Sequence, residues 1–227
     1  MEFKSDIYSI IKNSLKFNHS LIVENNDEYA LIDDKEAGIA YLALNKEGLD
    51  SFPLFTKAKK LEKTVCVISI YDYDLFAHPE FRSHFKVNQY RYDSEPFELS
   101  GKYDIAPITM NDYDYLYNKY THVDNREEYV KGAINRGMLK VTIDDKVVAF
   151  IGEHPEHTIG LLYVDEAYRH QGIARELEKA MINKFLKEGK EAINHVELDN
   201  VYSNMLQNSY KGMKKDEGYI DWYFNRI

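Results

Sequence analysis

The run Arg169 to Ala174, with the sequence Arg-His-Gln-Gly-Ile-Ala, has the residue types of an anion-binding loop. It follows a strand-like segment that ends at Val164 and precedes an amphipathic helix. Backbone N–H groups at a helix start lack partners within the helix, and the helix dipole adds positive potential, so phosphates bind there. Gly172 would permit close approach, and Arg169 could add a charge-assisted contact. The run predicts a phosphate-binding loop, although a helix with a small first turn would explain the same residues.

The clearest helix pattern of the chain positions this loop. Between Arg169 and Leu186, apolar residues recur at helical spacing and share one face: Ile173, Leu177, Ala180, Met181 and Phe185. Gly189, just after the pattern, is typical of a helix C-terminus. We therefore expect this helix to pack on a sheet.

The rest of the second half alternates between strand and helix patterns. Thr109 to Asp112 resembles a capping box that opens a helix, and Asp144-Asp145 suits a two-residue hairpin turn. Gly137 would end a second helix. The expected strands are 103–108, 138–143, 146–152, 157–164, 193–198 and 219–224, and the expected helices are 109–120, 124–136, 169–186 and 201–211.

The first hundred residues show helices and strands without an obvious site. The expected helices are 7–17 and 54–61, with another inside 72–84, and the expected strands are 21–23, 29–32, 39–44 and 65–70. Turn residues around Pro96 and at Ser100-Gly101 indicate a linker. The fold class is therefore α/β, with a smaller α/β domain at 1–100 before a second domain at 103–227.

Composition narrows the class of protein. Of 227 residues, 44% are hydrophobic and 30% are charged, which is ordinary for a globular protein. The net charge of −9 leaves no basic face for a nucleic acid. No apolar run is long enough to span a bilayer and no signal peptide is evident, so we expect a cytoplasmic protein without a membrane partner. The single cysteine, Cys66, lies in an apolar run and is expected to be buried.

Two short motifs together resemble the Gcn5-related N-acetyltransferase (GNAT) superfamily. Arg169-x-x-Gly172-x-Ala174 resembles its motif A, and Asn200-x-x-Ser203-x-x-Leu206 resembles the segment after the following strand. Within the superfamily, the likeness is greatest to the glycine N-acyltransferase-like group with an FR47 domain. The segments Leu162-Tyr163-Val164 and His195-Val196 resemble the corresponding segments of that group. The likeness covers 103–227; for 1–100 it rests on length and on alternating elements, which leaves a degenerate copy of the same fold as one alternative.

The resemblance implies a GNAT fold, with a mixed central sheet flanked by helices, that binds acetyl-CoA or another acyl-CoA and needs no metal. Main-chain groups of Leu162, Tyr163 and Val164 would bind the pantetheine arm. Asn200 would reach the pantetheine region, with Ser203 nearby. Arg169 would support the pyrophosphate, which the amides of the next six residues would hold: His170, Gln171, Gly172, Ile173, Ala174 and Arg175.

The acid for the leaving thiolate is missing from its usual place. Direct transfer of an acyl group to an amine needs a base for the amine and an acid for the thiolate. Many members of the superfamily use a tyrosine seven residues after the motif asparagine, and Gln207 stands there in this chain. Tyr210, about one helical turn later, is the candidate that remains.

The base for the amine is also missing from its expected place. In the superfamily a carboxylate serves as this base, and the corresponding position in this chain is close to Thr158. The nearest alternatives are Glu153, Glu156 and His157. Histidine titrates near neutral pH, which favours His157. The same stretch is also typical of a solvated hairpin turn, and Pro155 within it argues against a convergent metal site.

We interpret the chain as an N-acyltransferase that moves an acetyl or other short acyl group from acyl-CoA to a primary amine in a ternary complex. A small-molecule amine is the expected acceptor. In the superfamily the first helix borders the acceptor site, and here it carries four tyrosines: Tyr113, Tyr115, Tyr117 and Tyr120. Two alternatives remain, a CoA-binding regulatory module without catalysis and a protein-interaction domain on the same fold. The oligomeric state stays open, with a homodimer as one alternative.

Overall fold

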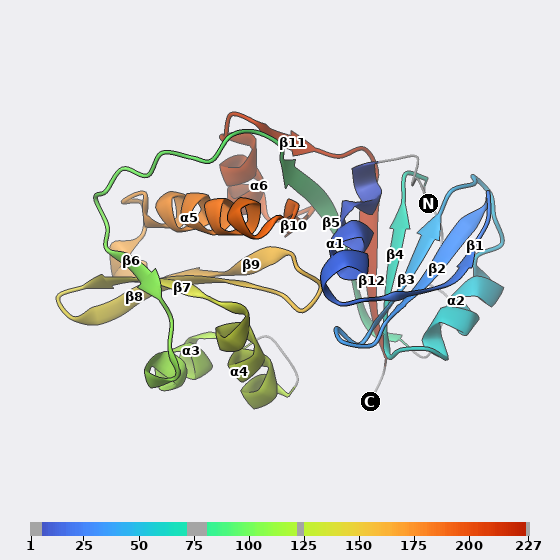
Figure 1. Ribbon diagram of the computed structural model, residues 1–227, viewed down its shortest axis with the longest axis horizontal. Coiled ribbons are helices and arrows are strands. Elements are labelled where there is room, and N and C mark those ends of the chain that lie inside the picture. The colour runs from blue at the N-terminus through green and yellow to red at the C-terminus, as the bar shows by residue number, and fades with distance from the viewer. Residues whose placement is uncertain (1–5, 72–80, 122–124, 226–227) are drawn as a thin grey trace. The chain divides into compact units, whose positions relative to one another are not determined.

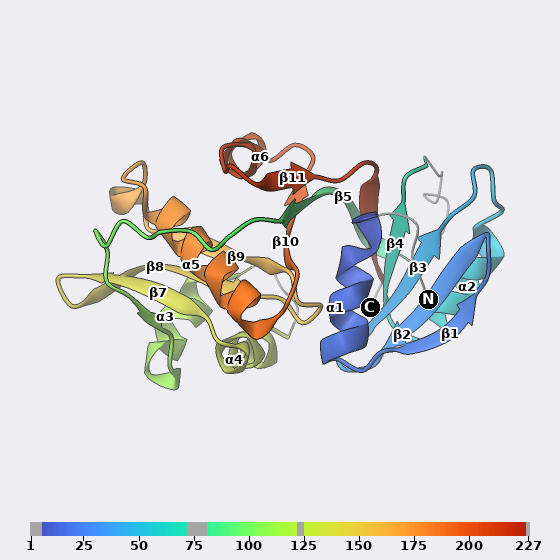
Figure 2. The same ribbon diagram turned by 45° about the horizontal axis from the view of Figure 1, so that its top comes forward.

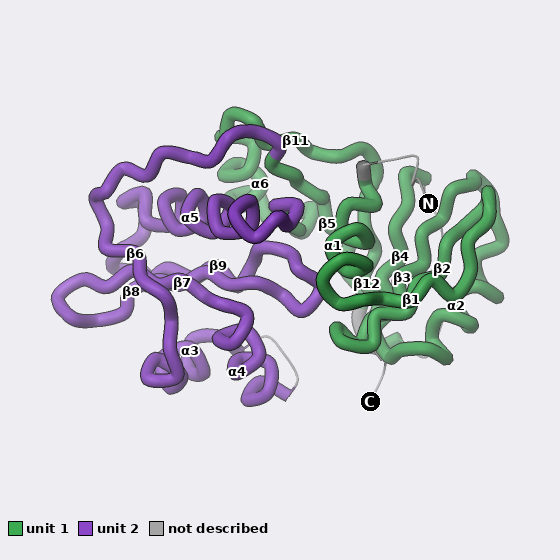
Figure 3. The backbone as a smooth tube through the Cα atoms, viewed as in Figure 1, with its two compact units in different colours: residues 1–92, 193–227 green, residues 93–192 purple. Residues whose placement is uncertain are grey.

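The computed structural model describes residues 6–71, 81–121 and 125–225 as an α/β protein (Figure 1 and, turned by 45°, Figure 2). The chain forms two compact units, shown in different colours in Figure 3. Unit 1 contains Met1–Tyr92 and Ile193–Ile227, and unit 2 contains Asp93–Ala192. No helix in the described part of the chain is long and apolar enough to cross a bilayer.

Unit 1 is built on a mixed sheet. Its helical elements are η1 (Asp6–Tyr8), α1 (Ser9–Phe17), α2 (Phe52–Lys59) and α6 (Val201–Asn208). Its strands are β1 (Leu21–Asn25), β2 (Tyr29–Asp34), β3 (Ile39–Leu44), β4 (Thr64–Ser69), β5 (Phe81–Tyr92), β10 (Ala192–Glu197), β11 (Met213–Lys215) and β12 (Tyr219–Asn225). They lie in the order β1-β2-β3-β4-β12-β5-β10, with β11 against β5. β3 and β4 run parallel, and β12 is antiparallel to both β4 and β5.

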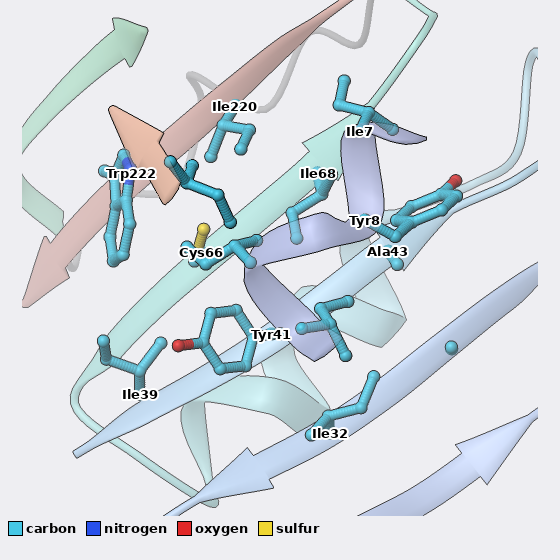
Figure 4. Packing of buried hydrophobic residues seen from close by; sticks show 14 of the residues in the cluster. Ile7, Tyr8, Ile32, Ile39, Tyr41, Ala43, Cys66, Ile68, Ile220 and Trp222 are labelled. Carbon is cyan, nitrogen blue, oxygen red and sulfur yellow. The ribbon is translucent and has the colours of Figure 1, made fainter. Parts of the chain in front are cut away.

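Helices cover both faces of this sheet. Successive strand side chains point to opposite faces, so Tyr41 and Cys66 pack in one cluster with residues of η1 and α1, and those of η1 are labelled in Figure 4. On the other face, Leu42 and Val65 pack with Phe55 of α2. All six residues of β3 are buried as a result. Cys66 is buried, which confirms the expectation from the sequence.

The first half of the chain confirms most predicted elements and corrects one. The opening helix, the three strands that follow it, α2 and β4 lie close to the predicted ranges. Residues 81–84, the last part of the segment expected to contain a helix, begin the long strand β5, and 72–80 lie outside the described residues. Phe81 and Val87 are both buried, and β5 pairs with β12, which is far away in sequence. Local periodicity cannot report such a pairing.

Unit 2 is an antiparallel sheet between helices. Its helical elements are η2 (Met110–Asp112), α3 (Tyr113–Lys119), α4 (Arg126–Arg136), η3 (Glu166–Tyr168) and α5 (Ile173–Glu188), and its strands are β6 (Ile105–Pro107), β7 (Leu139–Ile143), β8 (Lys146–Glu153) and β9 (Ile159–Val164). The strands lie in the order β6-β7-β8-β9. In Figure 1, α3 and α4 cover one face and α5 covers the other.

Local sequence signals set the ends of these elements. The Thr109 N–H donates to the Asp112 carboxylate at 2.9 Å, which completes the predicted capping box before α3. Asp144 and Asp145 have φ values of 49° and 59° in the predicted hairpin turn. Gly137 and Gly189 adopt the left-handed conformation after α4 and α5. These predictions are confirmed.

The predicted linker around Pro96 lies docked on α5. The Phe97 N–H donates to the Asn183 side chain at 2.7 Å, and the Asn183 amide donates back to the Phe97 carbonyl at 2.8 Å. The Ser100 N–H donates to Glu176 at 2.7 Å. The segment is therefore held against α5 as part of unit 2. The division into domains at 1–100 and 103–227 stays a prediction, while the compact units place 193–227 with unit 1.

Replacing Gly218 by alanine should destabilise unit 1. Gly218 has φ +85°, and an added Cβ would lie 2.5 Å from the Ser69 carbonyl oxygen. Left-handed strain and overpacking together should lower the free energy of unfolding by about 2–5 kcal/mol, measured by urea denaturation. Gly48→Ala is the matched control, because Gly48 has φ +67° and open space around it. An equal loss in both variants would contradict the steric explanation.

Candidate functional site

Strand β9 carries an irregularity before the loop. Val164 pairs with Ala149 and Tyr163 with Phe150, but the register then shifts, and Gly160 pairs with Gly152. Leu161 and Leu162 therefore lie opposite a single residue of β8. Leu161 has φ 53°, a left-handed conformation that is rare for a branched side chain. Such a bulge removes main-chain groups from the ladder, in the segment where the sequence predicts pantetheine contacts.

The loop after β9 has the backbone of an anion site. His170 and Gly172 have φ values of 61° and 89°. Helix α5 begins at Ile173 and not at Arg169 as predicted, because the left-handed Gly172 cannot belong to the helix. The first helical hydrogen bond runs from the Glu176 N–H to the Gly172 carbonyl at 3.1 Å, so the amides of Ile173 and Ala174 have no acceptor within the helix.

Side chains fix the conformation of the loop. The Arg169 Nε donates to the Val164 carbonyl at 3.0 Å, and Gln171 donates to the Ala167 carbonyl at 3.4 Å. The hydroxyl of Tyr103 donates to the Gln171 carbonyl. Arg169 thus ties the loop to the end of β9, and its contact with phosphate stays a prediction. A Cβ placed on Gly172 would meet no atom within 4 Å, so the space beside the helix start is open.

The remaining predicted residues divide between the units. Arg175 lies in the first turn of α5 in unit 2, whereas Asn200, Ser203 and Tyr210 lie in unit 1. The Asn200 side chain caps α6 by accepting the Ser203 N–H at 3.1 Å. Tyr210 is buried. The roles of these three residues toward pantetheine and thiolate stay predictions.

The predicted hairpin turn is present between β8 and β9, but it is not solvated as expected, because Glu153 and His157 are buried in a cluster of charged and polar side chains. Glu153 is fully buried, and its carboxylate contacts the His157 ring. Lys190 Nζ lies 2.7 and 3.0 Å from its two oxygens, and Lys184 Nζ lies 3.7 Å away. Burial alone would raise the pKa of Glu153, but the hydrogen bonds from His157 and Lys190 lower it below its ordinary value. A carboxylate so well paired is a weak base, which favours a structural role.

The rest of this loop packs against α4. The hydroxyl of Tyr129 contacts the His154 ring, and a Cβ on Gly160 would overlap that ring. Burial lowers the pKa of His154. Thr158, at the position of the base in the superfamily, donates to Glu156 at 2.8 Å. Among the residues that the structure describes, no group of three or more His, Cys, Asp or Glu side chains could hold a metal ion.

Asp165, which the sequence reasoning missed, collects three donors at the end of β9. Tyr115 donates to Oδ2 at 2.9 Å, Tyr163 donates to Oδ1 at 3.1 Å, and Lys119 Nζ lies 2.7 Å from Oδ1. Burial would raise the pKa of Asp165, but these hydrogen bonds lower it below its ordinary value. Of this cluster, the sequence analysis singled out only Tyr115, as one of the tyrosines on α3. Asp165 lies 50 residues later in the sequence, so the pattern around Tyr115 could not indicate it.

Residues 102–208 match the acetyltransferase (GNAT) family. No curated protein matches the chain in sequence.

Solved structures match nearly the whole chain. A Drosophila protein is 10% identical with a TM-score of 0.65, over 96% of this chain and 89% of that protein. A GNAT-family protein from Novosphingobium aromaticivorans is 16% identical with a TM-score of 0.61, over 96% and 98%. A GNAT-family acetyltransferase from Colwellia psychrerythraea is 14% identical with a TM-score of 0.53, over 99% and 98%. At these identities the likeness shows a shared fold.

Replacing Glu153 by glutamine should cost stability. The change removes one counter-charge from Lys190 and Lys184, which keep Glu188 as a partner at 2.9 and 2.8 Å, so we expect a loss of about 1–3 kcal/mol in the free energy of unfolding by urea denaturation. Because the pKa of Glu153 is lowered on folding, its contribution is present above about pH 4.3 and disappears as the pH falls through the folded-state value. The variant should therefore lose less stability than the parent on acidification.

Glu127→Gln is the control, since Glu127 forms an exposed i,i+4 pair with Lys131. We expect it to change stability by less than about 1 kcal/mol. A stable Glu153→Gln protein that loses only its turnover would instead support Glu153 as the base.

Proposed function

We propose that the chain is an N-acyltransferase that uses acetyl-CoA, starting from the match of residues 102–208 to the acetyltransferase (GNAT) family. The proposed reaction moves an acetyl group, or another short acyl group, to a primary amine. The observation that carries the proposal is structural: a bulged strand β9 is followed by a left-handed Gly172 and then by the start of α5. Together they leave main-chain groups available along a strand and at a helix N-terminus.

These two kinds of main-chain group suit the two parts of the cofactor. The pyrophosphate carries negative charge, and the α5 start offers N–H groups and a favourable dipole. The pantetheine arm carries amide groups that can pair with strand-like backbone at Leu162, Tyr163 and Val164. Exposed side chains at Arg169 and His170 flank the anion site. No metal is required for this binding.

The amine nitrogen attacks the thioester carbonyl, the C–S bond breaks, and the thiolate of CoA leaves. The amine loses one proton and the thiolate gains one, so no redox partner is needed. Holding two reactants in place can supply about 7–11 kcal/mol of the barrier reduction, whereas one acid or base supplies about 10²–10⁴-fold in rate. Because Glu153 and His157 contact each other, the proposal rests on positioning, with proton transfer through water or through Tyr210.

A CoA-binding module without turnover is the second candidate. Thr158 and Gln207 occupy the two positions where the superfamily usually carries its base and acid, and both side chains are buried. This candidate shares the cofactor site with the first and differs only in chemistry. Binding of acetyl-CoA without acetylation of any amine would favour it.

Replacing Gly172 by tryptophan should abolish binding of acetyl-CoA. An indole at this position would project into the open space beside the α5 start, and Gly172 is left-handed, with φ 89°. Isothermal titration should give a clear heat for the parent protein and a dissociation constant at least about a hundredfold weaker for the variant, equivalent to about 2.7 kcal/mol.

Gly48→Trp is the control, because Gly48 also has a positive φ and open surroundings but lies in unit 1. It should bind like the parent protein. No heat from the parent protein, with no competition by CoA, would overturn the proposed function and leave an interaction domain on a GNAT fold.

A further inference from the structure

The ammonium group of Lys119 lies between two tyrosine rings and a carboxylate. Lys119 Nζ is 5.7 Å from the ring centre of Tyr115 and 5.3 Å from that of Tyr163. It lies 2.7 Å from Oδ1 of Asp165. Two aromatic faces and one anion are the groups that recognise a cationic amine in proteins. The protein thus shows, with its own side chain, that an alkylammonium group fits here.

The carboxylate is held independently of Lys119. The hydroxyls of Tyr115 and Tyr163 donate to Asp165 at 2.9 and 3.1 Å, and the Asp165 N–H donates to the Val148 carbonyl at 2.8 Å. Tyr163 also stacks on Phe150, with ring centres 5.4 Å apart. An incoming cation would therefore meet a preorganised group, which reduces the entropy lost on binding.

Lys119 can leave this position at small cost. Its side chain is 36% exposed and that of Asp165 is 24% exposed. Ion pairs with this much solvent access contribute little to stability, and lysine holds its charge on a flexible stem. A ligand ammonium could therefore replace that of Lys119 against the same oxygen and the same rings.

We propose that Tyr115, Tyr163 and Asp165 form a cage for a positively charged group of the acceptor, and that Lys119 fills this cage in the absence of acceptor. The proposal rests on the proposed function and names its substrate class. Tyr163 belongs to the β9 segment expected to carry the pantetheine arm, so a caged cation would lie beside that arm. Because the attacking amine must be neutral, the acceptor is a diamine or polyamine, with one amine caged and another reacting.

The test compares 1,4-diaminobutane with butylamine as acceptors of the acetyl group from acetyl-CoA. The two amines share a four-carbon chain, and only the first has a second ammonium group. For the parent protein we expect kcat/KM to be about tenfold higher for 1,4-diaminobutane. Asp165→Asn should reduce this ratio to about one. Lys119→Met should lower the KM for 1,4-diaminobutane several-fold and leave that for butylamine unchanged.

Lys131→Met is the matched control. Lys131 also pairs with a carboxylate, Glu127, at 2.6 Å and lies 5.6 Å from a tyrosine ring, that of Tyr113, but it is outside the cage. This variant should have the same kcat/KM and KM as the parent protein for both amines. The opposite directions expected for Asp165→Asn and Lys119→Met cannot both arise from misfolding.

Each result has a defined meaning. Turnover with no preference between the amines, or a Lys119→Met variant that resembles the parent protein, overturns the cage and leaves the proposed function intact. Failure to bind acetyl-CoA overturns the proposed function instead. If acetyl-CoA binds without turnover, calorimetric titration of each amine into the CoA-saturated protein decides the point. Heat from 1,4-diaminobutane alone, lost in Asp165→Asn, supports the cage, and equal or absent heats overturn it.

Discussion

Backbone N–H and C=O groups inside a protein must be hydrogen bonded, and unit 2 depends on two places where this requirement is relaxed. One is the bulge at Leu161 and Leu162, and the other is the start of α5 after Gly172. Both would be liabilities in an ordinary sheet or helix. Under the proposed function, the two places would bind the two parts of a long, amide-rich and phosphorylated ligand with little use of side chains.

The surrounding residues keep this relaxed stretch in place. Non-glycine residues in the left-handed region, such as Leu161 and His170, are costly and persist only where the surroundings determine them. Gly152 provides space for Leu161, because a Cβ there would lie 2.9 Å from a Leu161 methyl group. Tyr103 fixes the loop from one side. At the far end of α5, the buried carboxylate of Glu153 holds Lys190, so both ends of the helix are anchored.

The sequence predicted best those features that depend on the conformational preference of a single residue and its near neighbours. The capping box at Thr109, the Asp144-Asp145 turn and the glycine that ends α5 each depend on neighbours within a few residues, and they were predictable for that reason. The start of α5 directly after Gly172 follows from the helix pattern beside that glycine, whereas the binding of an anion there stays a prediction. Local patterns could not reveal that β5 pairs with β12, or that Asp165 meets Tyr115. Such contacts depend on the completed fold.

The strand order of unit 1 also bears on how the chain acquires its structure. β12 lies between β4 and β5, and it follows every other strand of this sheet in the sequence. Unit 2, in contrast, is one uninterrupted stretch of chain. During synthesis, unit 2 can fold as soon as it emerges, whereas β4 and β5 keep unpaired edges until residues 219–225 are made. In unit 1, β4 and β5 are therefore the strands exposed to aggregation or to chaperones while the chain is being made.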